Sequence, residues 1–442
     1  MRPRISVVIP THNRRDSLLR LLRALREGTY PHERFDVVIV ADGCTDDTVA
    51  VLHRTPFPFA MRVLEQSPGH GAGAARNLGA AHAAGALLVF LDDDIEPLPT
   101  LLEAHARAHA DGGDRMVIGP ALPRRPERCG FHELSVWAWW EEQFQRMRRP
   151  GYRFTFMDVL SGNCSLPAAC FVAVGGFDAT LPESCRDDFE LGARLIARGV
   201  RIAFAPDAAG YHHDATDRPR LMRRKRAEGK ADVALARRHP HLTPALPLAA
   251  PRGRAWSRSG LLRRLAFRGW LGNVLAAALL LSMDALEFLR LRGSWRRLQG
   301  GVQSYWYWRG VADAVGTQRA LAELLGRTTD SAGATARAGA GTRTASVIEL
   351  DLRDEIGAVE RRLDEEQPDG AHLHYGIYDI GLIAPQPGAE RLRGEHLRPV
   401  LATTLAGPLL RALLIEAAAG AADIPAAAAA VAGTLWRLGG GT

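Results

Sequence analysis

Three consecutive carboxylates close a short apolar run, in a pattern suited to metal chemistry. The run is Leu87 to Leu91, and Asp92, Asp93 and Asp94 follow it directly. Five apolar residues predict a strand buried on both faces, and alternation along it turns Asp92 and Asp94 the same way. Two carboxylates held close together repel each other unless a hard cation neutralises them. Oxygen ligands favour Mg²⁺ or Mn²⁺, and such an ion is often shared with a phosphate. A solvated acidic turn is the alternative that this stretch leaves open.

Two more pairs of chemically capable residues occur further along the chain. Asp187 and Asp188 stand at the start of a helical pattern, Phe189 to Ala197, where their charges complement the helix dipole. His212 and His213 follow a short predicted strand, and paired histidines are most often surface residues. Taken alone, neither pair indicates a site.

The elements that must position these residues alternate between strand and helix. Strands are predicted at Ile5 to Ile9, Phe35 to Val40 and Met61 to Glu65, and Leu87 to Leu91 is the fourth. Four strands with helical crossovers predict an open parallel sheet whose ligands bind outside the carboxyl ends of the strands. The loops gathered at that edge are residues 10–14, 42–47, 69–77 and 92–94.

Two loop residues suit a nucleotide. Asp42 can accept hydrogen bonds from a ribose hydroxyl or a base N–H, although an Asp before Gly is also a common turn residue. Arg76 beside a helix N-terminus suits a phosphate. Gly71 and Gly73 match a dinucleotide-binding loop poorly, because they follow the third strand and lack the third glycine.

Four motifs in the first half of the chain resemble, in the same order, those of the family 2 glycosyltransferases with the GT-A fold. They are VVIPTHN (Val7 to Asn13), VADGCTDDT (Val40 to Thr48), GAGAARNLG (Gly71 to Gly79) and FLDDD (Phe90 to Asp94). The resemblance implies an α/β fold with a GT-A (Rossmann-like) open mixed sheet flanked by helices. It also implies transfer of a sugar, with inversion, from a nucleotide-diphosphate sugar, most commonly a UDP-sugar, to a hydroxyl acceptor.

The resemblance also implies roles for individual residues. The donor site would comprise Pro10, Thr11, Asn13, Asp42, Arg76, Asp92 and Asp93, with Thr11, Asn13 and Asp42 at the nucleoside and Arg76 at the base or diphosphate. Asp92 and Asp94 would hold Mg²⁺ or Mn²⁺, Asp93 would point away, and His212 or His213 would complete the octahedron.

An inverting displacement needs one base on the face opposite the leaving group. Asp188 stands where the family carries that base. Asp187 replaces the more usual Glu beside it, which leaves open which of the two carboxylates acts.

The formal charge of +7 in 442 residues is carried largely by arginine and indicates anionic partners such as nucleotide phosphates or lipid headgroups. No zinc-finger, recognition-helix or RNA-binding signature accompanies it, so nucleic acid is not an expected partner. Five cysteines without CxxC spacing favour reduced thiols, and the N-terminus does not read as a secretion signal. We therefore expect a cytoplasmic protein.

Two stretches near the expected site remain ambiguous. Residues 132–149 include Trp137, Trp139 and Trp140, which either stack on an acceptor ring or are core. The basic run Arg218 to Arg226 either clamps a diphosphate or is a solvated helix face touching lipid headgroups.

The expected organisation is a catalytic domain at 1–250, a helical segment at 251–327, a flexible linker at 328–345 and an accessory domain at 346–442. The helical segment has an uncharged run, Gly269 to Met283, that is short for a membrane span but has arginines on both sides. It either lies at a membrane interface or packs inside the protein. The last domain could supply strands and a helix over Leu401 to Ala418, broken at Gly407-Pro408, and oligomerisation is one role left open for it.

The leading hypothesis is a metal-dependent inverting glycosyltransferase acting on a carbohydrate or lipid-linked acceptor, in polysaccharide, glycolipid or cell-surface glycan synthesis. A sugar-nucleotide pyrophosphorylase would need a Gly-rich, Lys-containing loop after the first strand, and residues 10–14 contain neither type. A catalytically weak nucleotide-binding scaffold or sensor at a membrane surface is the non-enzymatic alternative. It predicts lost carboxylates, yet Asp92, Asp94 and Asp188 are present.

Overall fold

The computed structural model describes residues 2–124, 130–181, 185–213, 217–249, 258–334, 345–420, 429 and 431–435. The chain forms two compact units. One comprises Met1–Gln145 and Phe156–Ala334, and the other comprises Arg146–Thr155 and Thr335–Thr442. Each unit is described by itself.

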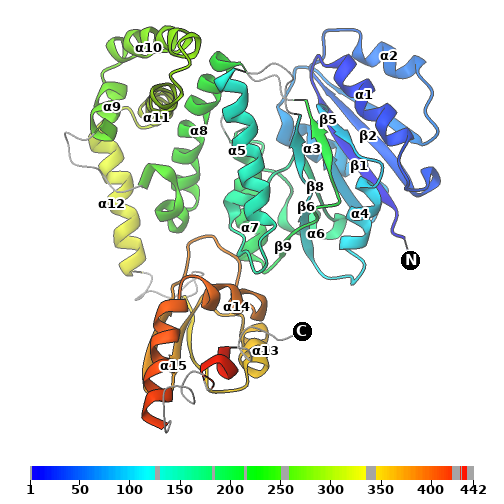
Figure 1. The fold of residues 1–442 in the computed structure, drawn as a ribbon. Helices are drawn as coiled ribbons and strands as arrows, with labels where there is room; N and C mark the ends of the chain where they lie inside the picture. Colours follow the sequence, from blue (N-terminus) through cyan, green and yellow to red (C-terminus); the bar gives the residue numbers. More distant parts are fainter. Residues whose placement is uncertain are drawn as a thin grey trace. The chain divides into compact units, whose positions relative to one another are not determined.

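A seven-stranded sheet forms the centre of the first unit, in the strand order β3-β2-β1-β4-β8-β6-β9 (Figure 1). Its strands are β1 (Ile5–Thr11), β2 (Phe35–Asp42), β3 (Ala60–Gln66), β4 (Leu87–Leu91), β6 (Arg115–Ile118), β8 (Asn163–Pro167) and β9 (Arg201–Phe204). The first four are parallel, and β8 runs antiparallel between β4 and β6. The sheet is therefore open and mixed, which confirms the predicted fold class.

The central strands are apolar because helices cover the sheet. Every residue of β1 and β4 is buried. The helices nearest to them in the chain are α1 (Arg15–Arg26), α2 (Thr48–Arg54), α3 (Ala72–Ala81), α4 (Leu101–Ala108), α6 (Ala168–Val174) and α7 (Asp187–Ala197). Strand β1 continues through Pro10. Proline has no N–H to donate to a neighbouring strand, and it is tolerated here because β4 pairs with β1 only as far as Val8 and leaves that edge open.

A second, three-stranded sheet lies beyond the end of β4. It consists of β5 (Ile95–Pro97), β10 (Gly210–His212) and β7 (Ala121–Pro123), with β10 in the middle. The antiparallel pairing of β10 with β5 sets His212 opposite Ile95. It thereby brings the histidine pair next to the three aspartates.

The rest of the first unit is helical: α5 (Phe131–Met147), α8 (Arg218–Arg238), α9 (Arg258–Phe267), α10 (Trp270–Phe288), α11 (Arg292–Val315) and α12 (Gln318–Ala334). Helices α8 and α11 cross closely at Gly229 and Gly310, where a Cβ atom would collide with the backbone of the other helix. Of the predicted linker 328–345, residues 328–334 belong to α12 and 335–344 lie outside the described residues. Short 3₁₀ helices occur at His32–Arg34, Phe156–Asp158, Pro240–Ala245 and Pro247–Ala249.

The second unit is a small α/β module. Its sheet has the order β11-β12-β13, formed by β11 (Val347–Asp351), β12 (Gly370–Tyr375) and β13 (Tyr378–Ile383). Its helices are α13 (Ile356–Glu366), α14 (Gly394–Ala402) and α15 (Ala406–Gly420). The segment Arg146–Thr155 joins it through hydrogen bonds from Arg153 to the carbonyls of Glu390 and Asp369.

The predicted helix break at Gly407-Pro408 was placed too late in the chain. Helix α14 ends at Ala402 and α15 begins at Ala406, so Pro408 lies in the first turn of α15. The missing amide of proline costs nothing there, because first-turn N–H groups have no partner within the helix. Among the described residues no single helix has the length and apolarity to cross a membrane, although α14 and α15, bent by 77°, meet that test as a pair.

Candidate active site

The loops after β1 and β2 are tied together by one asparagine. Asn13 Oδ1 accepts hydrogen bonds from the backbone amides of Thr45 (2.7 Å) and Asp46 (3.2 Å). Its backbone has φ 54°, a left-handed conformation that Asn adopts more readily than most residues. The side chain therefore shapes the rim of the site.

Asp42 closes β2 and organises the loop before α3. Its two carboxylate oxygens accept from the amides of His70 and Gly71, each at 2.7 Å. Asp42 therefore has the turn-forming role that is common for an Asp before Gly. A carboxylate has further lone pairs, so these bonds leave acceptor capacity for a ligand.

The three aspartates after β4 have different partners. Asp93 is buried and accepts from Thr11 Oγ1 and from Arg14, both at 2.8 Å. Asp92 and Asp94 are half-buried, and Arg14 also reaches Asp94 at 2.7 Å. Burial raises the pKa of Asp93 to about 6. For Asp94 burial acts in the same direction, but His212 and Arg14 outweigh it and lower the pKa to about 2.

Arg76 joins the aspartates after β4 to those that open α7. Its guanidinium is buried, and it donates to Asp92 Oδ1 at 2.6 Å and to Asp187 Oδ2 at 3.5 Å. Although burial opposes the charge, the two carboxylates raise the pKa of Arg76. Two acidic motifs about 95 residues apart in the sequence thus share one cation.

The structure distinguishes the two histidines of the pair. His212 Nε2 lies 3.5 Å from Asp94 Oδ1, whereas His213 Nε2 lies 2.6 Å from Glu96 Oε2. Neighbouring side chains of an extended segment point to opposite sides, so only one of the two can face Asp94. The ring of Trp140 packs edge-on against His212, with centroids 5.4 Å apart.

Asp187 and Asp188 are held at the first turn of α7. The residue before them, Arg186, has φ 66° and donates to Asp232 (3.1 Å) and Glu228 (3.3 Å) of α8. Burial, and secondarily the charge of Asp187, raises the pKa of Asp188 to about 7. Burial also raises the pKa of Asp187. A carboxylate in this range can accept a proton near neutral pH.

Sequence comparison gives the family. The model for "Glycosyl transferase family 2" matches residues 6–168, which include the loops after β1, β2 and β4. Validoxylamine A glucosyltransferase from Streptomyces hygroscopicus subsp. jinggangensis is 31% identical over 298 residues, covering 61% of this chain and 68% of that protein. The chain belongs to glycosyltransferase family 2.

Two further similar proteins are more distant in sequence. The pre-mycofactocin glycosyltransferase of Mycobacterium tuberculosis is 28% identical over 264 residues, covering 57% of this chain and 52% of that protein. Among solved structures, the mannosyltransferase PcManGT from Pyrobaculum calidifontis, in complex with GDP-Man and Mn²⁺, superimposes with a TM-score of 0.43 and 20% identity. That match covers 69% of this chain and 86% of the other.

In this glycosyltransferase a cleft of about 490 Å³ opens beside Asp94. Its lining includes Asn13, Arg14, Asp46, Asp94 and Arg220. Arg220 belongs to the basic run 218–226, so part of that run faces the site. Arg218 instead pairs with Asp284 and Glu287 of α10. The cleft lies on the side of Asp94, and Asp187 and Asp188 are not among its lining residues.

Several residues around this glycosyltransferase site were not anticipated from the sequence. Arg14 directly follows the VVIPTHN motif, and Arg186 directly precedes Asp187 and Asp188. Their positions next to these motifs are the signal from which they could have been predicted. Asp232 and Tyr307 carried no such signal, yet Tyr307 donates to Asp232 at 2.8 Å and so supports Arg186. Of the three tryptophans, Trp140 is buried and Trp139 is 46% exposed.

Proposed function

We propose that this family 2 enzyme is a metal-dependent inverting glycosyltransferase. It transfers a sugar from a nucleotide-diphosphate sugar, with UDP as the nucleotide, to a hydroxyl group of a carbohydrate or lipid-linked acceptor. The products belong to polysaccharide, glycolipid or cell-surface glycan synthesis. The observation that carries the proposal is Arg76, because it joins Asp92 of the donor-side motif to Asp187 beside the proposed base.

The nucleoside lies against the loops after β1 and β2. Pro10 is the last but one residue of β1, and Thr11 fixes Asp93 beneath the donor. Asn13 and Asp42 offer amide and carboxylate groups to the ribose and the base. The diphosphate lies toward Arg14 and Arg220, whose charges line the cleft.

The donor atoms near Asp94 fit a hard divalent cation. Asp94 Oδ1 and His212 Nε2 are 3.5 Å apart, too far for a strong hydrogen bond and close enough to share one ion. Asp92 would add a second carboxylate, and so a third ligand, once a bound nucleotide competes for Arg76. Carboxylates with a single imidazole suit Mg²⁺ or Mn²⁺. The ion would neutralise the negative charge that develops on the nucleoside diphosphate as it leaves the sugar.

The proton of the acceptor hydroxyl is taken up at the start of α7, on the side of Arg76 away from Asp92. Asp188 takes the proton from the acceptor hydroxyl as that oxygen forms its bond to the anomeric carbon and the bond from carbon to the diphosphate oxygen breaks. Because burial raises its pKa to about 7, Asp188 can gain and lose a proton near neutral pH. Asp187 keeps Arg76 in place and is a positioning residue.

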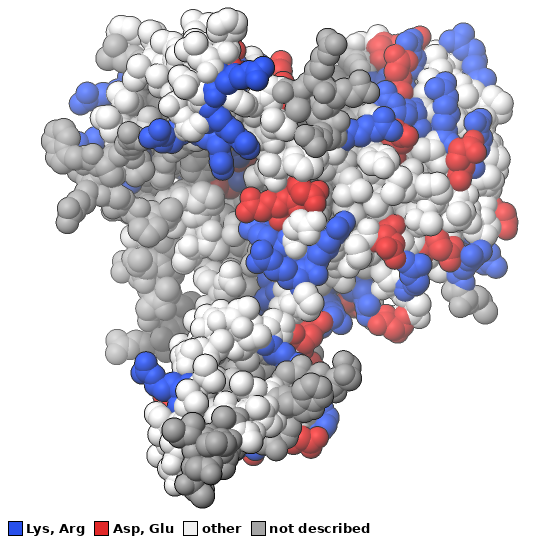
Figure 2. All heavy atoms as spheres, in the orientation of Figure 1, with Lys and Arg blue, Asp and Glu red and all other residues white. Residues whose placement is uncertain are grey.

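The enzyme works at the cytoplasmic face of a membrane as a peripheral protein. Helix α10 exposes large apolar side chains along one face, with exposed fractions of 70% at Trp270, 74% at Leu281 and 87% at Phe288. Figure 2 shows basic side chains bordering the surface over α9 and α10 at the upper left. The exposed arginines near the two ends of α10 are Arg264, Arg268, Arg290 and Arg292. An apolar face with basic flanks suits the interface of an anionic bilayer.

Titration calorimetry of the whole chain with UDP, with and without Mn²⁺, tests the proposal. We expect binding that depends on the metal, and metal-independent binding or no binding would count against it. A panel of nucleotide sugars, each scored for release of the nucleoside diphosphate, then identifies the donor. Metal-dependent binding without turnover on any donor and acceptor would favour a nucleotide sensor instead.

A further inference from the structure

A cluster of imidazoles and carboxylates lies in the second unit, on the open face of the sheet β11-β12-β13. Along β12, Ala371 and Leu373 are buried, so His372 and His374 point together to the other face. Pairing of β11 with β12 sets Glu349 opposite His372. The cluster therefore follows from strand alternation and register, and nothing in the proposed transferase reaction uses it.

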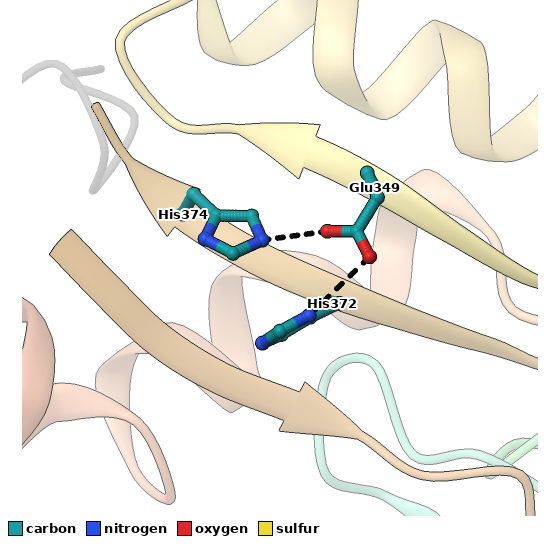
Figure 3. Close-up of side chains that lie close together, drawn as sticks. All are labelled: Glu349, His372 and His374. Carbon is teal, nitrogen blue, oxygen red and sulfur yellow. Dashed lines mark hydrogen bonds and ion pairs between the residues drawn. The ribbon is translucent and has the colours of Figure 1, made fainter. Parts of the chain in front are cut away.

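The ligand atoms of this cluster already converge. Glu349 Oε2 lies 2.6 Å from His374 Nε2, and Glu349 Oε1 lies 3.3 Å from His372 Nδ1. Figure 3 shows the two carboxylate oxygens of Glu349 linked by dashed lines to the two histidine rings. The three donor atoms lie within 4.8 Å of one another, and among the described residues no other such group of three or more was found. Ligands of one tetrahedral Zn²⁺ are roughly 3.4 Å apart, given bond lengths of about 2.0 to 2.1 Å.

A second carboxylate orients one of the histidines. Asp379 Oδ1 on β13 lies 3.0 Å from His372 Nε2, on the opposite side of the ring from Glu349. A proton held on Nε2 by Asp379 leaves the lone pair of Nδ1 directed toward Glu349. Histidines that bind metals commonly donate their second N–H to a carboxylate in this way.

Charge and exposure are also appropriate for a metal. Two carboxylates and two neutral imidazoles carry a charge of −2, which one divalent cation balances. Both histidine side chains are 31% exposed and Glu349 is 68% exposed, so ions and water can reach the cluster. Three protein ligands with an open side leave at least one coordination position for water.

We propose that Glu349, His372 and His374 bind a first-row transition metal ion of the Zn²⁺ type, with Asp379 as the positioning residue for His372. The two imidazoles separate this site from the one near Asp94. Imidazole-rich sites select Zn²⁺ and its neighbours, whereas oxygen-rich sites hold Mg²⁺ or Mn²⁺. The bound ion joins β11 to β12 and presents an exchangeable water on the surface of the module.

Titration of the whole chain with Zn²⁺, in excess Mg²⁺, tests the proposal. We expect one strong site per chain, and we expect the double variant His372→Ala/His374→Ala to lose it. Glu349→Gln keeps the shape of the side chain and should weaken binding at least 10-fold, and Asp379→Asn should weaken it about 10- to 100-fold. His53→Ala, which removes an exposed histidine of α2, is the matched control and should leave binding unchanged.

Co²⁺ provides an independent readout. Visible absorption typical of Co²⁺ bound by nitrogen and oxygen should appear with the wild-type chain and be absent from the double variant. Loss of binding with an unchanged circular dichroism spectrum separates lost ligands from lost folding. Zn²⁺ binding that is absent in the wild type, or equal in wild type and double variant, would overturn the proposal and leave only ion pairs across the strands.

Discussion

The buried guanidinium of Arg76 and the half-buried carboxylate of Asp92 form an ion pair, with 2.6 Å between nitrogen and oxygen. The same guanidinium lies 3.5 Å from Asp187, so it links the C-terminal end of β4 to the first turn of α7. The proposed donor and acceptor sides of the site are therefore joined by one side chain.

Removing Arg76 should destabilise the first unit. Arg76→Ala leaves Asp92 and Asp187 without their shared cation. Removing one partner of a fully buried pair costs roughly 3–5 kcal/mol, and because the Asp92 side chain is 37% exposed we expect a loss toward the lower end of that range. Denaturant titration of the variant measures the loss. The triple change Arg76→Ala/Asp92→Asn/Asp187→Asn removes the uncompensated charges and should recover part of it. No difference in stability between the single and triple variants would mean that uncompensated carboxylate charge does not cause the loss.

Asp188→Asn should abolish transfer and leave the affinity for UDP within about 2-fold. A general base contributes roughly 10² to 10⁴-fold to the rate, and Asn cannot accept the proton. Initial rates and calorimetry on the same preparation measure both quantities. Asp187→Asn is the matched comparison: because Asp187 holds Arg76, this change should alter donor binding as well as rate. Undiminished turnover in Asp188→Asn would remove that residue from the mechanism.

The rate of transfer should rise with pH through about 7. Burial raises the pKa of Asp188 to that value, and only its ionised form accepts a proton. Stability should move in the opposite direction. The folded state retains the proton above the ordinary Asp value, so this group lowers stability progressively between about pH 4 and pH 7. Asp188→Asn should therefore increase Tm at pH 8 and change it little at pH 4. Equal shifts at both pH values would contradict the assignment.

His212→Ala should weaken the Mn²⁺-dependent binding of UDP by 10-fold or more, and His213→Ala should leave it nearly unchanged. The reason is that His212 faces Asp94 at 3.5 Å, whereas His213 is bonded to Glu96. The two neighbours control for each other, since both lie at the end of β10. Calorimetry across a series of Mn²⁺ concentrations measures the difference. The reverse order of effects would assign the ligand to His213.

Phe288→Asp and Leu281→Asp on α10 should reduce binding to anionic vesicles, with little effect on transfer to a water-soluble acceptor. Each change places a charge on an exposed apolar face, where it opposes insertion among headgroups and disturbs no buried contact. Co-sedimentation with vesicles containing phosphatidylserine measures binding. Ile377→Asp, equally exposed on the other unit, is the control. Vesicle binding that survives both changes on α10 would exclude this face.

The sequence by itself was sufficient for the first four strands and for the order of the acidic motifs. Apolar runs such as Leu87 to Leu91 have few alternatives to a buried strand, and side-chain alternation is a local property. The family resemblance likewise rests on residues close together in the chain. Both the strand predictions and the family resemblance therefore depended only on residues close together in the sequence.

Tertiary structure alone decided which groups meet. Arg14 bridges Asp93 and Asp94, and Arg76 pairs with Asp187 from more than 100 residues away. The placement of His212 near Asp94 follows from the pairing of β10 with β5. The convergence of Glu349 with His372 and His374 follows from the register of β11 on β12. Such contacts depend on how strands align across the fold, and no single segment of the sequence encodes that alignment.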